Sequence, residues 1–191
     1  MFIKDPRTGN AQRITDQGRA MVEGPMISRL GHISDIIQSA YSIYGRINLT
    51  LTATDQYLLF IQNDSDDQLH ISNLTTSTNG SAVKVEGHLN GTRTSGGVVR
   101  TPLNMNRYSG NIAALTIYDG GAADLVCAVP AGQAGELIDM RLSTGFSTYT
   151  HDFKDALILK KNDTFIVMTS GTSGDVVRCA MQCYFESVER E

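Results

Sequence analysis

The sequence predicts an all-β protein, built as an antiparallel β-sandwich of two sheets preceded by an extended N-terminal arm. Three observations support this fold class. In residues 176–186 two sets of side chains alternate with a period of two, which places them on opposite faces of a strand, and residues 164–169 are β-branched and aromatic enough for a strand buried on both faces. Short segments of this kind follow one another, with turn residues roughly every 8–14 positions. The 18 glycines, together with many Ser, Thr and Asn residues, favour turns and strands over helices.

The length and composition fit one domain with a full core plus an arm. The chain has 191 residues, of which 41% are hydrophobic and 19% are charged, as in globular proteins. A formal net charge of −4 gives no basic surface, so we expect no nucleic acid partner. No apolar run approaches the ~18 residues of a membrane span. The N-terminus lacks the apolar stretch of a secretory signal. We therefore expect no membrane partner.

Residues 1–40 are predicted to form the arm. Positions 5–10 have a turn composition, and the apolar residues that follow fit neither the helical nor the strand period. Three interpretations stay open: a frayed terminus, an extended arm that crosses a neighbouring subunit or a partner surface, or a small ordered β-element. Residues 34–38 are compatible with the start of a short helix. The arm residues that we expect at an interface are Met21, Val22, Met26, Ile27 and Leu30.

Residues 41–191 are predicted to form the sandwich. A long half-exposed strand alternates over residues 41–53, and the apolar run at 57–61 suits a central strand buried on both faces. The acidic turn at 63–67 does not have the spacing of a calcium loop, so we expect it to be solvated. Strands over 69–76 and 82–89 follow, and Asn79-Gly80 between them is a hairpin signal.

The second half of this domain continues the strand pattern. Residues 90–97 are predicted as a polar loop, and residues 98–103 as an edge or connecting strand because they end near Pro102. Further strands are expected over 112–118, 125–129 and 137–142. In residues 156–186 three strands are separated by turns at 160–163 and 170–175, the second of which is predicted as a hairpin tip. One face of the last strand is expected to be buried: Val177, Cys179, Met181, Cys183 and Phe185.

The three cysteines are predicted to be small core residues. Cys179 and Cys183 would lie on one strand face about 13 Å apart at ~3.3 Å per residue, too far for a disulfide. An odd and small number of cysteines, the third being Cys127, fits an intracellular origin. No His or Cys residues have the spacing of a zinc finger, so we expect no metal site.

The sequence offers no catalytic motif. Its four histidines are scattered, and it lacks a nucleophile elbow and a phosphate-binding loop. His151 lies beside Asp152 and Asp155, but such a group in a polar loop is usually solvated. We therefore expect no catalytic residue, no cofactor and no enzymatic activity. The two predicted loop aromatics that suit recognition are Tyr108 and Tyr149.

Several segments resemble the single jelly-roll virion proteins of tailed bacteriophages. They are residues 5–9 in the arm and residues 49–54, 57–63, 102–109 and 157–163, so the resemblance covers most of the chain from Tyr41 on. It implies a jelly-roll-like sandwich that serves as a capsid cement or decoration protein, often trimeric, with the major capsid protein as partner. It also implies a place in the virion, after assembly in the host cytoplasm. The family brings no catalytic residues.

Three functional hypotheses follow. The first is a capsid-stabilising structural protein whose arm contributes to contacts between subunits. The alternative is a phage fibre or tail jelly-roll module that binds a receptor or carbohydrate through residues 90–97 and 144–152, including Tyr149. The third, a cupin-like enzyme, requires clustered histidines, which the sequence pattern does not predict.

Overall fold

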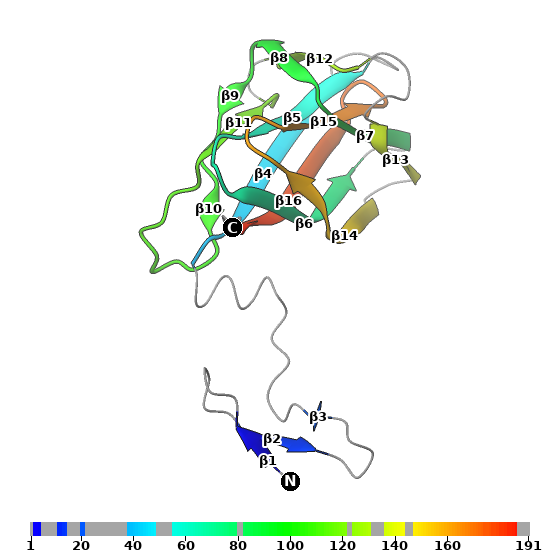
Figure 1. Cartoon of the computed structure of the whole chain (residues 1–191). Helices are drawn as coiled ribbons and strands as arrows, with labels where there is room; N and C mark the ends of the chain where they lie inside the picture. Colours follow the sequence, from blue (N-terminus) through cyan, green and yellow to red (C-terminus); the bar gives the residue numbers. More distant parts are fainter. Residues whose placement is uncertain are drawn as a thin grey trace.

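The computed structural model describes residues 2–4, 11–14, 20–21, 38–48, 55–79, 82–121, 124–130, 136–143 and 147–186. All regular secondary structure in these ranges is β-strand, arranged in antiparallel sheets (Figure 1). The predicted all-β class is therefore confirmed. These ranges contain no helix with the length and hydropathy that a membrane crossing requires.

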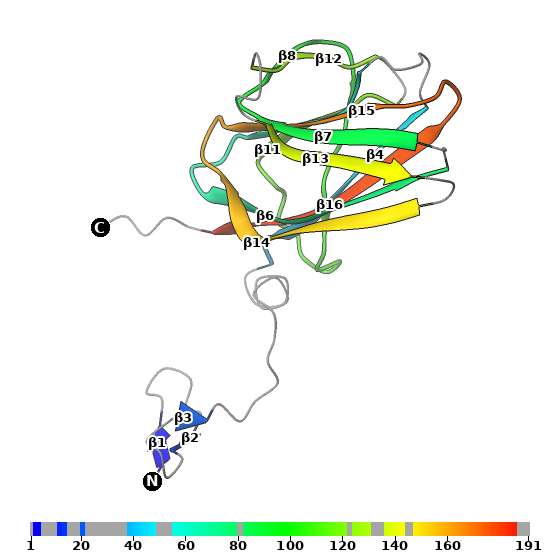
Figure 2. The same cartoon turned by 90° about the vertical axis from the view of Figure 1, so that its right-hand side faces the viewer.

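Two large sheets stack face to face (Figure 2). The five-stranded sheet has the order β10-β4-β16-β6-β14, and the six-stranded sheet has the order β13-β7-β15-β5-β11-β9. The short outer strands in these orders are β9 (Val98–Val99), β10 (Leu103–Asn104) and β11 (Leu115–Asp119). The main strands of the first are β4 (Ala40–Asn48), β6 (Gln68–Thr78), β14 (Ser147–Leu159) and β16 (Val176–Glu186). Those of the second are β5 (Gln56–Asn63), β7 (Ala82–Leu89), β13 (Glu136–Ser143) and β15 (Thr164–Ser170).

These eight strands have the connectivity of a jelly roll. Along the chain, each connection crosses from one sheet to the other, except the long one between β7 and β13. The resulting order, β4-β16-β6-β14 facing β5-β15-β7-β13, is that of a double-sheet jelly roll. The predicted jelly-roll-like sandwich is therefore confirmed.

The same connectivity shows that the hairpin predictions were wrong. The turn near Asn79 joins β6 to β7, which lie in different sheets, so these strands do not pair. Asn79 instead bonds to β16: its N–H donates to the Val176 carbonyl (3.3 Å), and its Oδ1 accepts from the Val176 N–H (2.6 Å). The turns at 160–163 and 170–175 also cross between sheets. Turn residues reverse the chain, whereas burial of apolar faces decides which sheet the next strand joins.

The main core lies between the sheets and follows the predicted period. The five alternating residues of β16 from Val177 to Phe185 are buried. All six residues Thr164–Thr169 of β15 are buried as well, as expected for a strand covered on both faces. Phe153 and Phe165 meet edge to face at 6.3 Å between ring centroids, and Tyr41 meets Phe185 at 6.0 Å. The three cysteines are buried and free, as predicted.

The two edge strands on one side of the sandwich are irregular. In β14 the register shifts between Asp152 and Leu157, where Lys154 (φ 51°) and Asp155 (φ 61°) adopt left-handed backbone conformations. In β13 it shifts between Glu136 and Ile138. Bulges of this kind disrupt the row of unpaired backbone groups that an edge strand offers to other chains.

The connection between β7 and β13 is a long insertion that extends both sheets. It contains β8 (Thr92–Ser95), β9 (Val98–Val99), β10 (Leu103–Asn104), β11 (Leu115–Asp119) and β12 (Val126–Ala128). β8 and β12 pair as a two-stranded ribbon, β11 and β9 extend the six-stranded sheet, and β10 pairs with β4. The predicted strand at 98–103 is thus two short edge strands. The prediction of a loop over 90–97 was wrong for 92–95, because polar residues there form β8.

The N-terminal region contains a small antiparallel sheet in the order β1-β2-β3, from β1 (Phe2–Lys4), β2 (Ala11–Ile14) and β3 (Ala20–Met21). The helix expected near residue 34 lies mostly outside the described residues. Gln38 and Ser39, which are described, are not helical, and β4 begins at Ala40. The predicted first strand, 41–53, is described as far as Asn48.

Candidate functional site

The interface residues predicted in the arm are largely outside the described part of the chain. The backbone of Met21 ends β3. Val22, Met26, Ile27 and Leu30 lie outside the described residues. Their predicted role stays a prediction.

Of the two aromatic residues predicted for recognition, Tyr108 lies in a loop as expected and Tyr149 does not. Tyr149 was expected in a loop over 144–152, but it belongs to β14, which begins at Ser147, so that prediction was wrong. The cause is a polar, Thr-rich strand end that pairs with β6 and resembles a loop in composition. Tyr108 does lie in a loop, and 89% of it is exposed.

The histidines of the described residues occupy separate structural positions. His70 is buried, stacks on Tyr184 at 5.0 Å between ring centroids, and has its Nε2 3.2 Å from Glu186 Oε2. His88 is buried on β7, and His151 packs against Phe153 at 4.7 Å. Among the described residues, no group of three or more His, Cys, Asp or Glu side chains is placed to hold a metal ion.

The carboxylates beside His151 are held by local hydrogen bonds. Asp152 Oδ1 accepts from the backbone N–H of Lys154 (2.9 Å). Asp155 Oδ1 accepts from the Ser72 hydroxyl (2.8 Å). Both acids therefore stabilise the bulge of β14, which is a structural role.

The most developed surface feature is the outer face of the six-stranded sheet, where the β8–β12 ribbon forms a second apolar layer. Phe60 of β5 and Ile166 and Met168 of β15 point away from the main core and pack with Leu125 and Cys127. Gly91 allows a close approach here, because a Cβ atom would meet the Ile166 Cδ1 and lie 3.0 Å from the Ala128 carbonyl oxygen. The Thr164 hydroxyl donates to the Gly91 carbonyl (2.6 Å) and fixes the start of the ribbon against β15.

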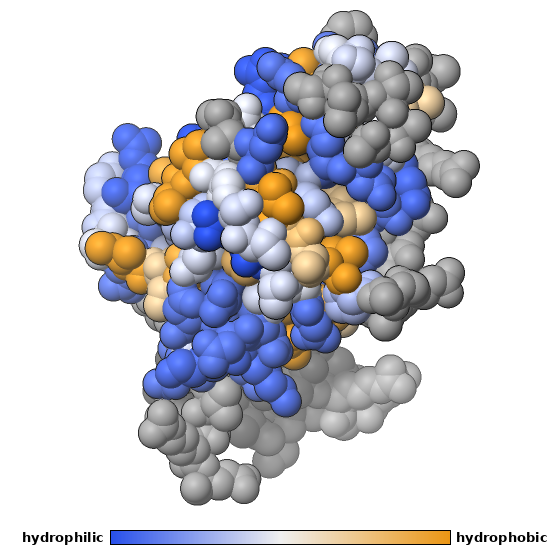
Figure 3. All heavy atoms as spheres, turned by 90° about the horizontal axis from the view of Figure 1, so that it is seen from above, coloured by the Kyte–Doolittle hydropathy of each residue, from blue (hydrophilic) through white to orange (hydrophobic). Residues whose placement is uncertain are grey.

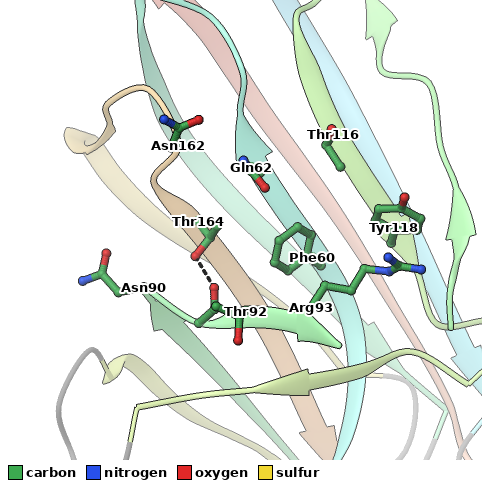
Figure 4. Close-up of a pocket in the computed structure, with 10 residues that line it drawn as sticks. Phe60, Gln62, Asn90, Thr92, Arg93, Thr116, Tyr118, Asn162 and Thr164 are labelled. Atoms are coloured by element: carbon green, nitrogen blue, oxygen red, sulfur yellow. Dashed lines mark hydrogen bonds between the residues drawn. The ribbon is translucent and has the colours of Figure 1, made fainter. Parts of the chain in front are cut away.

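A pocket of about 580 Å³ opens beside this ribbon. Phe60 and Gln62 of β5 and Thr116 and Tyr118 of β11 line it from the sheet. Figure 4 shows Phe60 in the middle of the lining residues. Phe60 is only 3% exposed, so its ring forms the floor of the pocket and not an open platform.

Arg93 provides the charged wall of the pocket. Its guanidinium carbon lies 3.7 Å from the centroid of the Tyr118 ring, a cation–π geometry. Its Nε and Nη2 donate to the Gly96 carbonyl at 2.9 and 2.7 Å. Arg93 is therefore held in one position, and no Asp or Glu is among the residues that line the pocket.

Three amide side chains complete the rim. Gln62 comes from β5, Asn90 from the start of the insertion and Asn162 from the turn before β15, and Figure 4 shows all three with Thr92 around the pocket. Asn90 and Asn162 have positive φ angles (60° and 68°), which place them in tight turns. Of these three residues, only Asn90 lies in a segment predicted for recognition, residues 90–97; Gln62 and Asn162 were not predicted as site residues. A signal in the sequence was available: the strand period places the aromatic residues Phe60 and Tyr118 on the outer face of the sheet, where an aromatic side chain needs a cover.

The cysteine thiol near this layer is not a nucleophile at neutral pH. Burial raises the pKa of Cys127 to about 11, although Arg93 acts in the opposite direction. Burial likewise raises the pKa of Tyr57, and the nearby Cys127 and Asp55 add to that shift. Both groups are therefore protonated and neutral in this layer at pH 7.

A second surface feature lies along the insertion, where it borders both sheets. We call it the edge patch, and its residues are Val99, Leu103, Met105, Tyr108 and Ile112. All five are exposed, Ile112 to 84%. The surrounding segment is fixed by hydrogen bonds: the Met105 N–H donates to the Ala40 carbonyl (2.9 Å), and Asn104 Nδ2 to the Gln38 carbonyl (2.9 Å).

An ion pair between Arg100 and the buried carboxylate of Asp119 fixes the same segment to the body. Arg100 Nε and Nη2 donate to Asp119 Oδ2 at 2.9 and 2.7 Å. Asp119 is fully buried, and its Oδ1 accepts from the N–H groups of Gly121 (2.8 Å) and Arg46 (3.4 Å). One carboxylate therefore connects the insertion to β4. Figure 3 shows hydrophobic groups in separate clusters among hydrophilic ones on the face seen from above.

Comparisons with known proteins add little to this geometry. No family model matches the sequence, and no curated protein matches it. One solved structure, described as "Structure of infectious bursal disease virus Gx strain", aligns at 13% identity with a TM-score of 0.14. The alignment covers 78% of this chain and 38% of that chain. A TM-score this low does not establish a common fold, so the match has no weight for function.

Proposed function

We propose that this protein is a structural component of a tailed-phage virion, a capsid cement or decoration protein that stabilises the head by contacts between subunits. The jelly roll supports this proposal, because it is an architecture of viral capsid domains, although lectins and cupins use it too. The fold alone therefore does not decide between these functions.

The observation on which the proposal depends is the edge patch. Single exposed apolar residues are normal on a protein surface. Five large ones along the single segment 99–112 are a concentration that supports a partner surface there. Their segment is fixed by the Arg100–Asp119 ion pair and by the bonds to Gln38 and Ala40. A fixed apolar surface loses little conformational entropy when it binds.

The partners that suit this surface are other copies of the chain and the major capsid protein. Full burial of one large apolar side chain contributes roughly 1.5–3 kcal/mol, and in a closed symmetric assembly each copy contributes the same patch. We propose a homotrimer that binds shells of the major capsid protein. A modest contact repeated over a shell then gives a large total stabilisation.

The test is the oligomeric state and shell binding of a variant with two patch residues changed, Leu103→Ser and Ile112→Ser. The wild-type chain should be a trimer in light scattering at micromolar concentration and should sediment with heads formed by the major capsid protein of the same genome. The variant should raise the dissociation constant of the trimer roughly tenfold or more.

The matched control is Ile158→Ser, which changes an exposed isoleucine of β14 outside the edge patch. It should leave the trimer and the shell binding intact. A wild-type chain that is monomeric and does not bind shells would refute the proposal.

A further inference from the structure

We infer that the pocket beside the β8–β12 ribbon is a saccharide-binding site, and that it favours a sugar with a carboxylate group. The inference depends on the chemistry of the pocket alone. It holds whether or not the protein binds a capsid.

The amide rim is the first argument. Gln62, Asn90 and Asn162 come from three separate segments, yet all three line the same pocket. No hydrogen bond from these three side chains to another described residue is found, so each has a carbonyl and an NH₂ group available. Sugar hydroxyl groups both donate and accept hydrogen bonds, and amides match them in both roles. The Thr92 hydroxyl adds a fourth group of this kind.

The floor is the second argument. Phe60, 3% exposed, closes the base of the pocket with the edge of its ring, and the half-buried Tyr118 stands beside it with ring centroids 6.4 Å apart. A pyranose ring has polar hydroxyl groups at its rim and C–H groups on its faces. An aromatic floor inside a ring of amides is complementary to that distribution. The pocket volume of about 580 Å³ also lies within the usual range of small-ligand sites.

Arg93 is the reason for a carboxylate. Guanidinium has five N–H donors, and the bonds to the Gly96 carbonyl use one from Nε and one from Nη2. The donors that remain, with no carboxylate in the pocket lining to neutralise them, suit an anionic ligand group. One arginine is enough for a single carboxylate. It is too few for the several charges of a nucleoside triphosphate.

The site is also held in place before any ligand binds. Thr164 fixes the ribbon through the Gly91 carbonyl, and the Thr116 hydroxyl donates to Asp64 Oδ2 (2.7 Å) at the opposite side. Arg93 is fixed by Tyr118 and Gly96. Preorganised donors reduce the entropy lost on binding, so a weakly binding single sugar should still give a specific signal.

The test is a titration of the ¹⁵N-labelled full chain with methyl β-D-glucuronide and, separately, with methyl β-D-glucoside. We expect chemical shift changes at the side-chain amides of Gln62, Asn90 and Asn162, and roughly tenfold tighter binding of the glucuronide, because a charge-assisted bond adds about that factor. An array of oligosaccharides identifies longer ligands and should favour acidic glycans.

Two variants with matched controls assign the effect. Arg93→Gln should bring glucuronide affinity down to that of the glucoside, whereas Arg107→Gln, an exposed arginine next to Tyr108, should change nothing. The double variant Asn90→Ala, Asn162→Ala should weaken the binding of both sugars. Asn48→Ala, at an exposed position of β4, should leave both affinities unchanged. Circular dichroism melts confirm that each variant is folded.

Several outcomes would overturn the inference. They are an array without a glycan hit, shift changes away from the pocket, equal affinity for the two glycosides, or tighter binding of uridine monophosphate than of the glucuronide. These outcomes are independent of the shell proposal, because the edge-patch variant should bind sugar normally and the pocket variants should form normal trimers.

Discussion

The two outer faces of the sandwich differ in what covers them. On the five-stranded sheet, most outward side chains of β4 and β16 reach solvent: Tyr44, Arg46, Asn48 and Arg178 are exposed. Tyr184 of β16 differs, because it is buried against Ala40 and His70. On the six-stranded sheet, the outward side chains Phe60, Ile166 and Met168 are buried beneath the β8–β12 ribbon. The outer face of one sheet is therefore largely open to solvent, and the outer face of the other carries a second apolar layer.

The difference follows from the insertion between β7 and β13. It supplies Leu125 and Cys127, which pack against the outer face and leave a pocket at the margin of the ribbon. A jelly roll needs only its inner faces to fold. The added layer thus gives this sandwich a recess without disturbing the main core, and the edge patch belongs to the same insertion.

The largest expected effect separates the two layers directly. Phe165 faces the main core and Ile166, its neighbour on β15, faces the ribbon, and both are fully buried. We expect Phe165→Ala to lower the free energy of unfolding by about 3–5 kcal/mol and Ile166→Ala by about 2–4 kcal/mol. Urea unfolding followed by circular dichroism measures both.

The control for this prediction is Arg178→Ala on the uncovered face, which should change stability by less than about 0.5 kcal/mol. If Ile166→Ala lowered the free energy of unfolding as little as Arg178→Ala, the ribbon would not pack against β15 as a second core. The pocket would then lack the side that the ribbon forms.

The strand pattern in the sequence also distinguished these faces. The run at 57–61 and the segment 164–169 have apolar residues at consecutive positions, which is the pattern of a strand covered on both sides, and β5 and β15 are such strands. The alternation in β16 predicted one buried face, and Val177 to Phe185 are buried accordingly. The fold class and the core were predictable because buried side chains recur with a regular period along a strand, and the sequence shows that period.

Pairing and the site were not predictable in this way. Asn79-Gly80 indicates a reversal, but only the competition among strands for the apolar faces determines that β6 joins β16 and β14. Likewise, Gln62, Asn90 and Asn162 are far apart in the sequence, and each is an ordinary strand or turn residue. The ribbon brings them together, and residues 92–95 were too polar to be recognised as one of its strands.

The second prediction concerns alkaline pH. Burial raises the pKa of Cys179 and Cys183 from 9.0 to about 12, and that of Cys127 to about 11. The unfolded chain releases these protons first, so it binds fewer protons than the folded chain above pH 9. Their contribution to stability is complete below pH 9 and is lost as the pH rises toward 12.

We expect the free energy of unfolding to fall between pH 8 and pH 10 by on the order of 1 kcal/mol per buried thiol. The raised pKa values of Tyr41 and Tyr57 act in the same direction. Cys127→Ala should make the free energy of unfolding less dependent on pH only if the ribbon still covers this thiol at pH 10. Cys179→Ala should have the same effect through a thiol of the main core. An unchanged slope in Cys179→Ala would contradict the assignment to thiols.

The smallest effect compares one hydroxyl group on each outer face. Thr164 donates to the Gly91 carbonyl beneath the ribbon, and Thr75 is hydrogen-bonded to Thr150 (2.9 Å) on the exposed face of the other sheet. Thr164→Val keeps the shape and leaves a buried carbonyl unpaired, so it should cost about 1–2 kcal/mol. Thr75→Val lets water replace the lost partner and should cost less than about 0.5 kcal/mol.

Thermal melts of the two valine variants measure the difference, and hydrogen exchange locates it. Thr164→Val should speed exchange of the β8 and β12 amides and leave β4 and β16 unchanged, because the hydroxyl fixes the ribbon and not the sandwich. Equal costs for the two variants would mean that water reaches Thr164. In that case the covered face would be open to solvent, and the contrast between the two sheets would be one of composition alone.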